Sequence, residues 1–226
     1  NNVSVGYQAL KANTTASYNT AVGWQAMLNN QTGTNNAAFG GAALKNNTGS
    51  FNTGIGRHAL EFNTSGTKNT GVGNIALSKN TTGSHNVALG YDALGDNTTG
   101  SSNTSIGSLA LYQNETGSNN VAVGFEALNQ NTDSNNTAVG YRALKVNTSG
   151  DNNVAVGGAV LDANTTGSNN TAVGYSSLSV NTTGQNNVAI GRGALEAYTD
   201  GNNTAVGVNA FGQSASGHSS VAIGYT

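Results

Sequence analysis

The sequence predicts an all-β protein built as a parallel β-solenoid, and three observations lead to this prediction. An apolar residue followed by glycine recurs fourteen times over 226 residues, at intervals of 16 or 17. A repeat of this length is too short for a pair of packed helices, which takes about 33 residues or more. The chain also contains no proline, which would interrupt a ladder of stacked strands because it lacks an N–H group. We therefore expect about 14 coils of 16–17 residues in a single repeat domain spanning residues 1–226.

Each coil is expected to contain one short strand that ends on the apolar residue before the glycine. In the stretch Thr137-Ala138-Val139-Gly140, alternate side chains point to opposite sides, as they do in any strand. The apolar position is Val, Ile, Leu or Phe in every copy, so we expect it to face the interior. The position before it is always Ala, Ser or Gly. We expect this column of small residues to face outward and to let another surface approach closely.

A second apolar column supplies the other half of the expected core. It lies four residues after each motif glycine and is Leu in most coils, with Met27 and Phe211 as larger substitutes. Two apolar columns per coil make a thin core, which becomes continuous because each coil covers its neighbours.

Asparagine falls in two regular columns among the 37 Asn residues of the chain. One column precedes the strand and runs from Asn2 to Asn203. The other opens the following turn, where stacked amides could hydrogen-bond from coil to coil as identical side chains do in stacked strands. Such a ladder would hide the recurring Asn-x-Ser/Thr sequons. We expect this structural ladder to contain Asn13, Asn63, Asn80, Asn97, Asn114, Asn147, Asn164 and Asn181.

Composition and charge exclude several classes of function. Only 8% of the residues are charged and the net charge is −2, which leaves no basic field for nucleic acid or for anionic lipid. There is no cysteine for disulfides or thiolate chemistry. No apolar run approaches the roughly 20 residues that span a bilayer. We expect no nucleic-acid partner and no membrane contact within this segment.

The sequence also offers no constellation typical of an active site. His58, His85 and His218 occupy different repeat positions in distant coils, so they cannot share a metal ion or activate one nucleophile. Neither a calcium-binding Gly-Gly-x-Gly-x-Asp repeat nor a phosphate-binding glycine loop is present. We expect no enzyme activity, no metal and no cofactor.

Aromatic residues follow the motif glycine in half of the coils. Exposed rings at these places could stack on sugar rings or insert into a partner, or they could cover coil edges and seams between chains. Threonine columns in the turns, such as Thr81, Thr98, Thr165 and Thr182, also leave an ice-binding surface as an alternative. The candidate ligand-contact aromatics are Tyr7, Trp24, Tyr91, Phe125, Tyr141 and Tyr175, and Tyr225 occupies the same position.

The closing stretch, N-A-F-G-Q-S-A-S-G-H-S-S-V-A-I-G from Asn209 to Gly224, resembles the head repeat of YadA-type trimeric autotransporter adhesins. The earlier Asn-Thr-Ala-Val-Gly coils are similar to a longer variant found in bacterial and phage tail-fibre-like proteins. The resemblance covers all fourteen motif copies, although most coils here are longer than the family's usual spacing. It implies a left-handed parallel β-roll that assembles as a trimer on a cell or virion surface.

Within such a trimer the small strand column would lie between chains. The resemblance thus implies a structural and adhesive segment of an extracellular fibre, acting as a stiff spacer and a multivalent contact surface. Expected partners are other copies of the chain, and a host or matrix protein or a surface polysaccharide, at the bacterial outer membrane or on a virion. The alternatives are a monomeric carbohydrate- or ice-binding solenoid, or a phage tail-fibre segment. Candidate inter-chain residues are Ala21, Ala122, Ala138, Ala155, Ala172 and Ala189.

Overall fold

The computed structural model describes residues 1–212 and 219–225. In this part of the chain, all regular secondary structure is β-strand, and each coil contributes one parallel strand. The predicted all-β parallel solenoid is therefore confirmed. No helix in the described residues is long and apolar enough to cross a membrane. The chain forms two compact units, Asn1–Ser118 and Asn119–Thr226.

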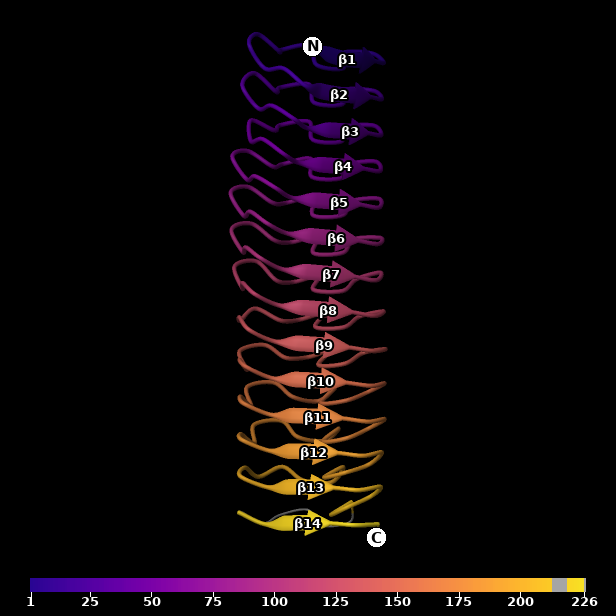
Figure 1. Cartoon of the computed structure of the whole chain (residues 1–226), viewed down its shortest axis with the longest axis vertical. Coiled ribbons are helices and arrows are strands. Elements are labelled where there is room, and N and C mark those ends of the chain that lie inside the picture. Colours follow the sequence, from indigo (N-terminus) through magenta and orange to yellow (C-terminus); the bar gives the residue numbers. More distant parts are fainter. Residues whose placement is uncertain (213–218, 226) are drawn as a thin grey trace. The chain divides into compact units, whose positions relative to one another are not determined.

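The first unit stacks its strands in sequence order, one coil above the next (Figure 1). Neighbouring strands pair in parallel and keep equivalent repeat positions opposite each other, as Ile55 and Val72 illustrate. The repeat therefore sets the strand register directly. The strands are β1 (Asn2–Val5), β2 (Asn19–Val22), β3 (Ala37–Phe39), β4 (Thr53–Ile55), β5 (Thr70–Val72), β6 (Val87–Leu89) and β7 (Thr104–Ile106).

The second unit repeats this arrangement. Val154 lies opposite Thr171, and Val156 lies opposite Val173, so the register again follows the sequence repeat. Length differences between coils are absorbed in the turns and leave the strand pairing unbroken. The strands are β8 (Val121–Val123), β9 (Thr137–Val139), β10 (Val154–Val156), β11 (Thr171–Val173), β12 (Val188–Ile190), β13 (Thr204–Val206) and β14 (Val221–Ile223).

The core runs between the strand and the leucine column, as the sequence predicts for that column. Leu44, Leu60 and Leu144 are completely buried, and so is the alanine that precedes each of them. Their backbone joins successive coils, because the Leu44 N–H donates to the carbonyl of Ala59 at 2.9 Å. These leucines adopt positive φ angles near 50°, an unusual conformation for a branched residue. Burial and the hydrogen bonds between coils offset this local strain.

The predicted orientation of the strand is wrong. The small residues face the interior: Ala21, Ala122, Ala138, Ala155, Ala172 and Ala189 all have 0% exposure within a single chain. The larger apolar residues face outward instead, and the Phe39 side chain is 42% exposed. Completely buried alanines cannot form a face between chains, so an inter-chain contact has to be sought on the opposite side of the strand.

The narrow cross-section of the coil explains this reversal. A methyl group added to Gly54 in β4 would lie 3.2 Å from Leu44 Cγ and 3.2 Å from the carbonyl oxygen of Ala59. The leucine column thus leaves room on the inner side of the strand for Ala, Ser or Gly only. In β7 the residue at this position is Ser105, whose hydroxyl donates to the carbonyl of Ala110 across the coil at 2.8 Å.

Two adjacent glycines provide a test of coil stacking. Gly40 has φ of 136°, and a methyl group there would lie 2.5 Å from the carbonyl oxygen of Gly56 in the next coil. Nothing lies within 4 Å of the corresponding point on Gly41. We expect Gly40→Ala to lower the melting temperature strongly and Gly41→Ala to leave it nearly unchanged, as measured by circular dichroism. Equal melting temperatures for the two variants would contradict the close approach of these coils.

Candidate interaction faces

Buried asparagines hold each turn against its strand. Asn80 Nδ2 donates to Asn63 Oδ1 at 2.6 Å and to the Gly83 carbonyl at 2.9 Å. The pre-strand Asn69 donates to that same Gly83 carbonyl at 2.8 Å, so one carbonyl joins both asparagine columns. The sequon nitrogens are therefore used in internal hydrogen bonds. Of the predicted ladder residues, Asn13 is half-buried and the others are fully buried: Asn63, Asn80, Asn97, Asn114, Asn147, Asn164 and Asn181.

The outward side chains of the strands form a regular surface, here called the strand face. Every strand supplies two residues to it: Thr, Val or Ala at its first outward position, and Val, Ile, Leu or Phe two residues later. Most of the second row is substantially exposed, for example 36% at Val139 and 46% at Leu89, whereas Val22, Val72 and Val123 are half-buried. None of the described strands carries a charged residue. A regular row of exposed apolar side chains of this kind is typical of an interaction site.

The residue after each motif glycine borders the strand face on one side; this column is called the trailing edge. All six candidate aromatics lie here and are exposed, from 43% at Phe125 to 66% at Tyr7. Phe125 and Tyr141 stack on each other, with ring centroids 5.8 Å apart and ring planes 11° apart. The Arg142 guanidinium also lies over the Tyr141 ring at 5.1 Å. Each of these two rings therefore already contacts another side chain of the same chain, which reduces the ring surface left for a sugar.

The opposite border, called the leading edge, is the exposed residue that precedes each pre-strand asparagine. The sequence alone did not identify this column as a surface feature. These residues have positive φ angles of about 60°, for example 57° at Lys68 and 59° at Asn169. The sequence did contain an indication of this conformation, because Asn tolerates a positive φ angle and occupies the position in six successive coils. The leading edge is Tyr18, Asn35, Phe51, Lys68, His85 and Ser102 in the first unit, and Asn119, Asn135, Asn152, Asn169, Asn186 and Asn202 in the second.

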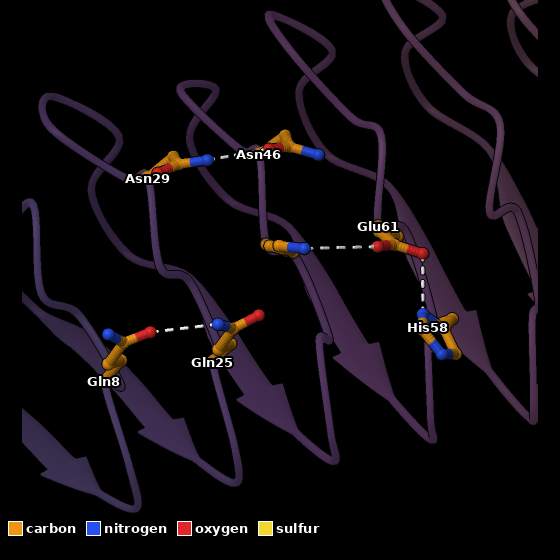
Figure 2. Close-up of polar contacts among 7 residues, drawn as sticks. Gln8, Gln25, Asn29, Asn46, His58 and Glu61 are labelled. Atoms are coloured by element: carbon orange, nitrogen blue, oxygen red, sulfur yellow. Dashed lines mark hydrogen bonds and ion pairs between the residues drawn. The ribbon is translucent and has the colours of Figure 1, made fainter.

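The chain segments that follow the strands carry polar pairs between neighbouring coils (Figure 2). In the first unit Gln25 donates to Gln8 at 2.9 Å and Asn29 donates to Asn46 at 2.8 Å. His58 and Glu61 are in contact at 2.6 Å (Figure 2). Lys45 approaches Glu61 from the preceding coil at 3.9 Å. Three of these contacts join residues 16 or 17 positions apart and fit a stabilising role between coils, whereas the His58–Glu61 contact lies within one coil.

The second unit has a three-residue ion-pair cluster on the same segments. Glu126 accepts hydrogen bonds from Arg142 and Lys145 in the next coil, both at 2.8 Å. The hydrogen bond from Lys145, reinforced by Arg142, lowers the pKa of Glu126 below its ordinary value of 4.5, although burial opposes this shift. The ionised carboxylate therefore favours the folded state.

This cluster predicts a pH dependence of stability. Because the Glu126 pKa is lowered in the folded state, its contribution is complete above pH 4.5 and is lost as the pH falls through the folded-state pKa. We expect Glu126→Gln to lower the free energy of unfolding at pH 7 and to have a diminishing effect below pH 4.5. Urea unfolding from pH 7 to pH 3 measures this. Lys145→Gln should reduce the same pH-dependent difference, and a pH-independent effect of Glu126→Gln would contradict the assignment.

The other candidate residues are not brought into one site. His58 pairs with Glu61, His85 lies on the leading edge, and His218 lies outside the described residues. No group of three or more His, Cys, Asp or Glu side chains suited to a metal ion occurs in residues 1–212 and 219–225. The hydroxyl groups of the turn threonines donate hydrogen bonds within the chain. The Thr81 hydroxyl donates to the Thr98 carbonyl at 2.9 Å, and the Thr165 hydroxyl donates to the Thr182 carbonyl at 3.0 Å. This internal use argues against the turns as an ice-binding array.

Comparison with known proteins adds no relative. No protein-family model, no curated protein and no solved structure matches the chain. The function therefore has to be inferred from the exposed faces, and above all from the uncharged strand face and its two edges.

Proposed function

We propose that this chain is a structural and adhesive segment of an extracellular fibre, in which three copies pack together through their strand faces. The exposed apolar row on consecutive strands carries this proposal. Val139, Val156 and Val173 each expose more than a third of their surface, although the neighbouring alanine on the other side of each of these three strands is completely buried. Burial of these side chains against other copies would remove apolar area from water, which is the main driving force for association.

A second copy of the chain is the occupant that best fits this face. Every coil presents the same two outward positions at the same spacing, so identical copies offer matching rows along about 30 Å of each seven-strand unit. The absence of charge on the strands removes the repulsion that identical charged surfaces would meet. The resemblance to YadA-type head repeats supports three copies and display on a bacterial or virion surface.

The adhesive part of the proposal rests on repetition. Buried amide ladders and unbroken strand pairing make each unit a stiff stack of nearly identical coils. The surfaces turned away from the strand face would then present many equivalent weak sites. Many such sites on one fibre give high avidity towards a matrix protein or a surface polysaccharide, although each site is weak.

Light scattering after size exclusion tests the assembly. We expect about three times the chain mass of 22.6 kDa for the native sequence. The double variant Val139→Arg/Val156→Arg should lose this assembly and keep the circular dichroism spectrum, because both side chains point away from the core. The matched control Thr166→Arg/Thr183→Arg places the same charges on exposed turns of the same unit and should remain assembled.

Two outcomes would overturn the proposal: a native chain that is monomeric, or an assembly that survives both arginines on the strand face. A stable monomer would favour a carbohydrate- or ice-binding solenoid. Glycan-array binding that is lost in Trp24→Ala would then support the carbohydrate function. Thermal hysteresis would support the ice-binding function.

A further inference from the structure

One level of the trailing edge in the first unit carries no side chain, because the residue there is Gly41. We propose that this open position, between Trp24 and Arg57, binds one carboxylated sugar ring of an acidic polysaccharide. This inference rests on the proposed adhesive function, and it names the class of ligand and the residues that recognise it.

Trp24, Gly41 and Arg57 lie on three successive coils. Their strands β2, β3 and β4 pair in parallel and in register, so the three residues occupy equivalent positions. Nothing lies within 4 Å of the point where Gly41 would carry a methyl group. Equivalent points on the outer two coils are about 9–10 Å apart, which is twice the spacing of neighbouring strands. This distance leaves room for one ring-shaped group between the two flanking side chains.

A second glycine on the trailing edge shows that such a position is not always open. At Gly158 in the second unit, the Tyr175 ring lies 3.3 Å from the corresponding methyl point. The aromatic side chain of the next coil thus covers the missing side chain there. At Gly41 neither neighbour does so. The Trp24 side chain is 53% exposed, and its ring does not fill the position.

The two flanking side chains have complementary chemistry for such a ligand. Trp24 is the only tryptophan of the chain, and an indole ring offers a large flat surface on which the C–H face of a sugar ring can pack. Arg57 is exposed, and its guanidinium forms no hydrogen bond or ion pair within residues 1–212 and 219–225. A guanidinium binds a carboxylate through two parallel hydrogen bonds. Together they select a sugar ring that carries an acidic group.

The number of charges favours a sugar over an acidic peptide. Among the trailing-edge residues of the first unit, all of which the structure describes, Arg57 is the only cation. Acidic peptides are recognised by clusters of basic residues, whereas one carboxylate on an otherwise neutral ring needs only one. The proposed assembly of three copies would carry three such sites beside its packed apolar rows. A polymer with a repeating acidic sugar would then bind with avidity.

NMR titrations observing the ligand, with trigalacturonic acid and with sialyllactose, test this site. We expect the native chain to bind at least one of the two, and to bind the methyl ester of that sugar at least about tenfold more weakly. Arg57→Gln and Trp24→Ala should each weaken binding at least about tenfold. Gly41→Tyr should have the same effect and keep the fold, because it fills the open position with the residue that Tyr7 and Tyr91 supply in other coils.

Arg192→Gln and Tyr141→Ala are matched controls on the trailing edge of the second unit. Both should leave binding unchanged, and every variant should keep the native circular dichroism spectrum. The site would be overturned if neither acidic sugar bound, if the methyl ester bound equally well, or if Arg57→Gln had no larger effect than Arg192→Gln. Binding of polyglutamate in place of the sugars would also overturn it, in favour of an acidic peptide.

Light scattering on the same samples separates this site from the proposed assembly. A native mass of three chains without sugar binding would overturn the site and leave the assembly intact. Sugar binding by a monomeric chain, lost in Arg57→Gln, would support the site and overturn the assembly.

Discussion

Replacement of Asn47 by alanine is expected to destabilise the first unit by at least about 3 kcal/mol. Asn47 Nδ2 donates to the carbonyl of Gly49 at 2.7 Å, and its Oδ1 accepts from Asn52 at 3.1 Å and from Asn63 at 2.6 Å. Asn47→Ala would leave these buried partners without one hydrogen bond each, and each unsatisfied buried group costs about 1–3 kcal/mol. Urea unfolding followed by circular dichroism measures the loss.

The neighbouring Asn46 is the matched control. It lies in the same turn, is partly exposed, and accepts one exposed hydrogen bond from Asn29 at 2.8 Å. We expect Asn46→Ala to change the free energy of unfolding by less than about 1 kcal/mol. If both variants unfolded at the same urea concentration, asparagine would be abundant for its turn conformation alone, and the buried ladder would not hold the coils together.

The repeat made much of the fold predictable. A fixed interval of 16 or 17 residues specified one strand per coil, parallel pairing and equivalent positions opposite each other, because a solenoid brings residue i next to its counterpart in the following coil. The leucine column was identified for the same reason. This position is Leu in most coils, whereas an exposed position would be expected to alternate between polar and apolar residues from coil to coil.

The orientation of the strand was harder to predict, because alternation identifies two sides without saying which one is inside. Hydrophobicity favoured Val and Phe39 for the interior, and the structure reverses this. The informative signal was size. Residues on the inner side never exceed alanine or serine, as Gly54 and Ser105 illustrate, whereas the outer side ranges from Val22 to Phe39. A position that accepts only small side chains in every coil indicates a crowded interior. A position that accepts side chains as large as Phe indicates open space outside the coil.

The contact surfaces follow from that orientation and could not be predicted without it. The leading edge becomes recognisable only once Lys68 and Asn169 are known to lie beside the strand face and to be exposed. Pairs between coils, such as Glu126 with Arg142, join residues 16 positions apart and need the coil geometry to be seen. Columns of a repeat are readable in the sequence, but the sides they occupy depend on how the turns bend.

A pair of leucine substitutions on β9 is expected to separate the two sides of the strand most clearly. Ala138 is completely buried and Val139 is 36% exposed. Ala138→Leu would force three extra carbon atoms into an interior already filled by the leucine column, at a cost of about 3 kcal/mol or more. Val139→Leu adds one carbon on the open side and should leave the free energy of unfolding within about 0.5 kcal/mol.

The same pair separates folding from assembly, because the two positions differ in what surrounds them. Thermal unfolding should show a strongly lowered transition for Ala138→Leu and a native transition for Val139→Leu. If copies pack through the strand face, Val139→Leu should still change the assembly equilibrium measured by light scattering at low protein concentration. The opposite result would be a native-like transition for Ala138→Leu and a destabilised Val139→Leu. It would mean that the alanine column faces outward, and the strand-face assembly would then lose its basis.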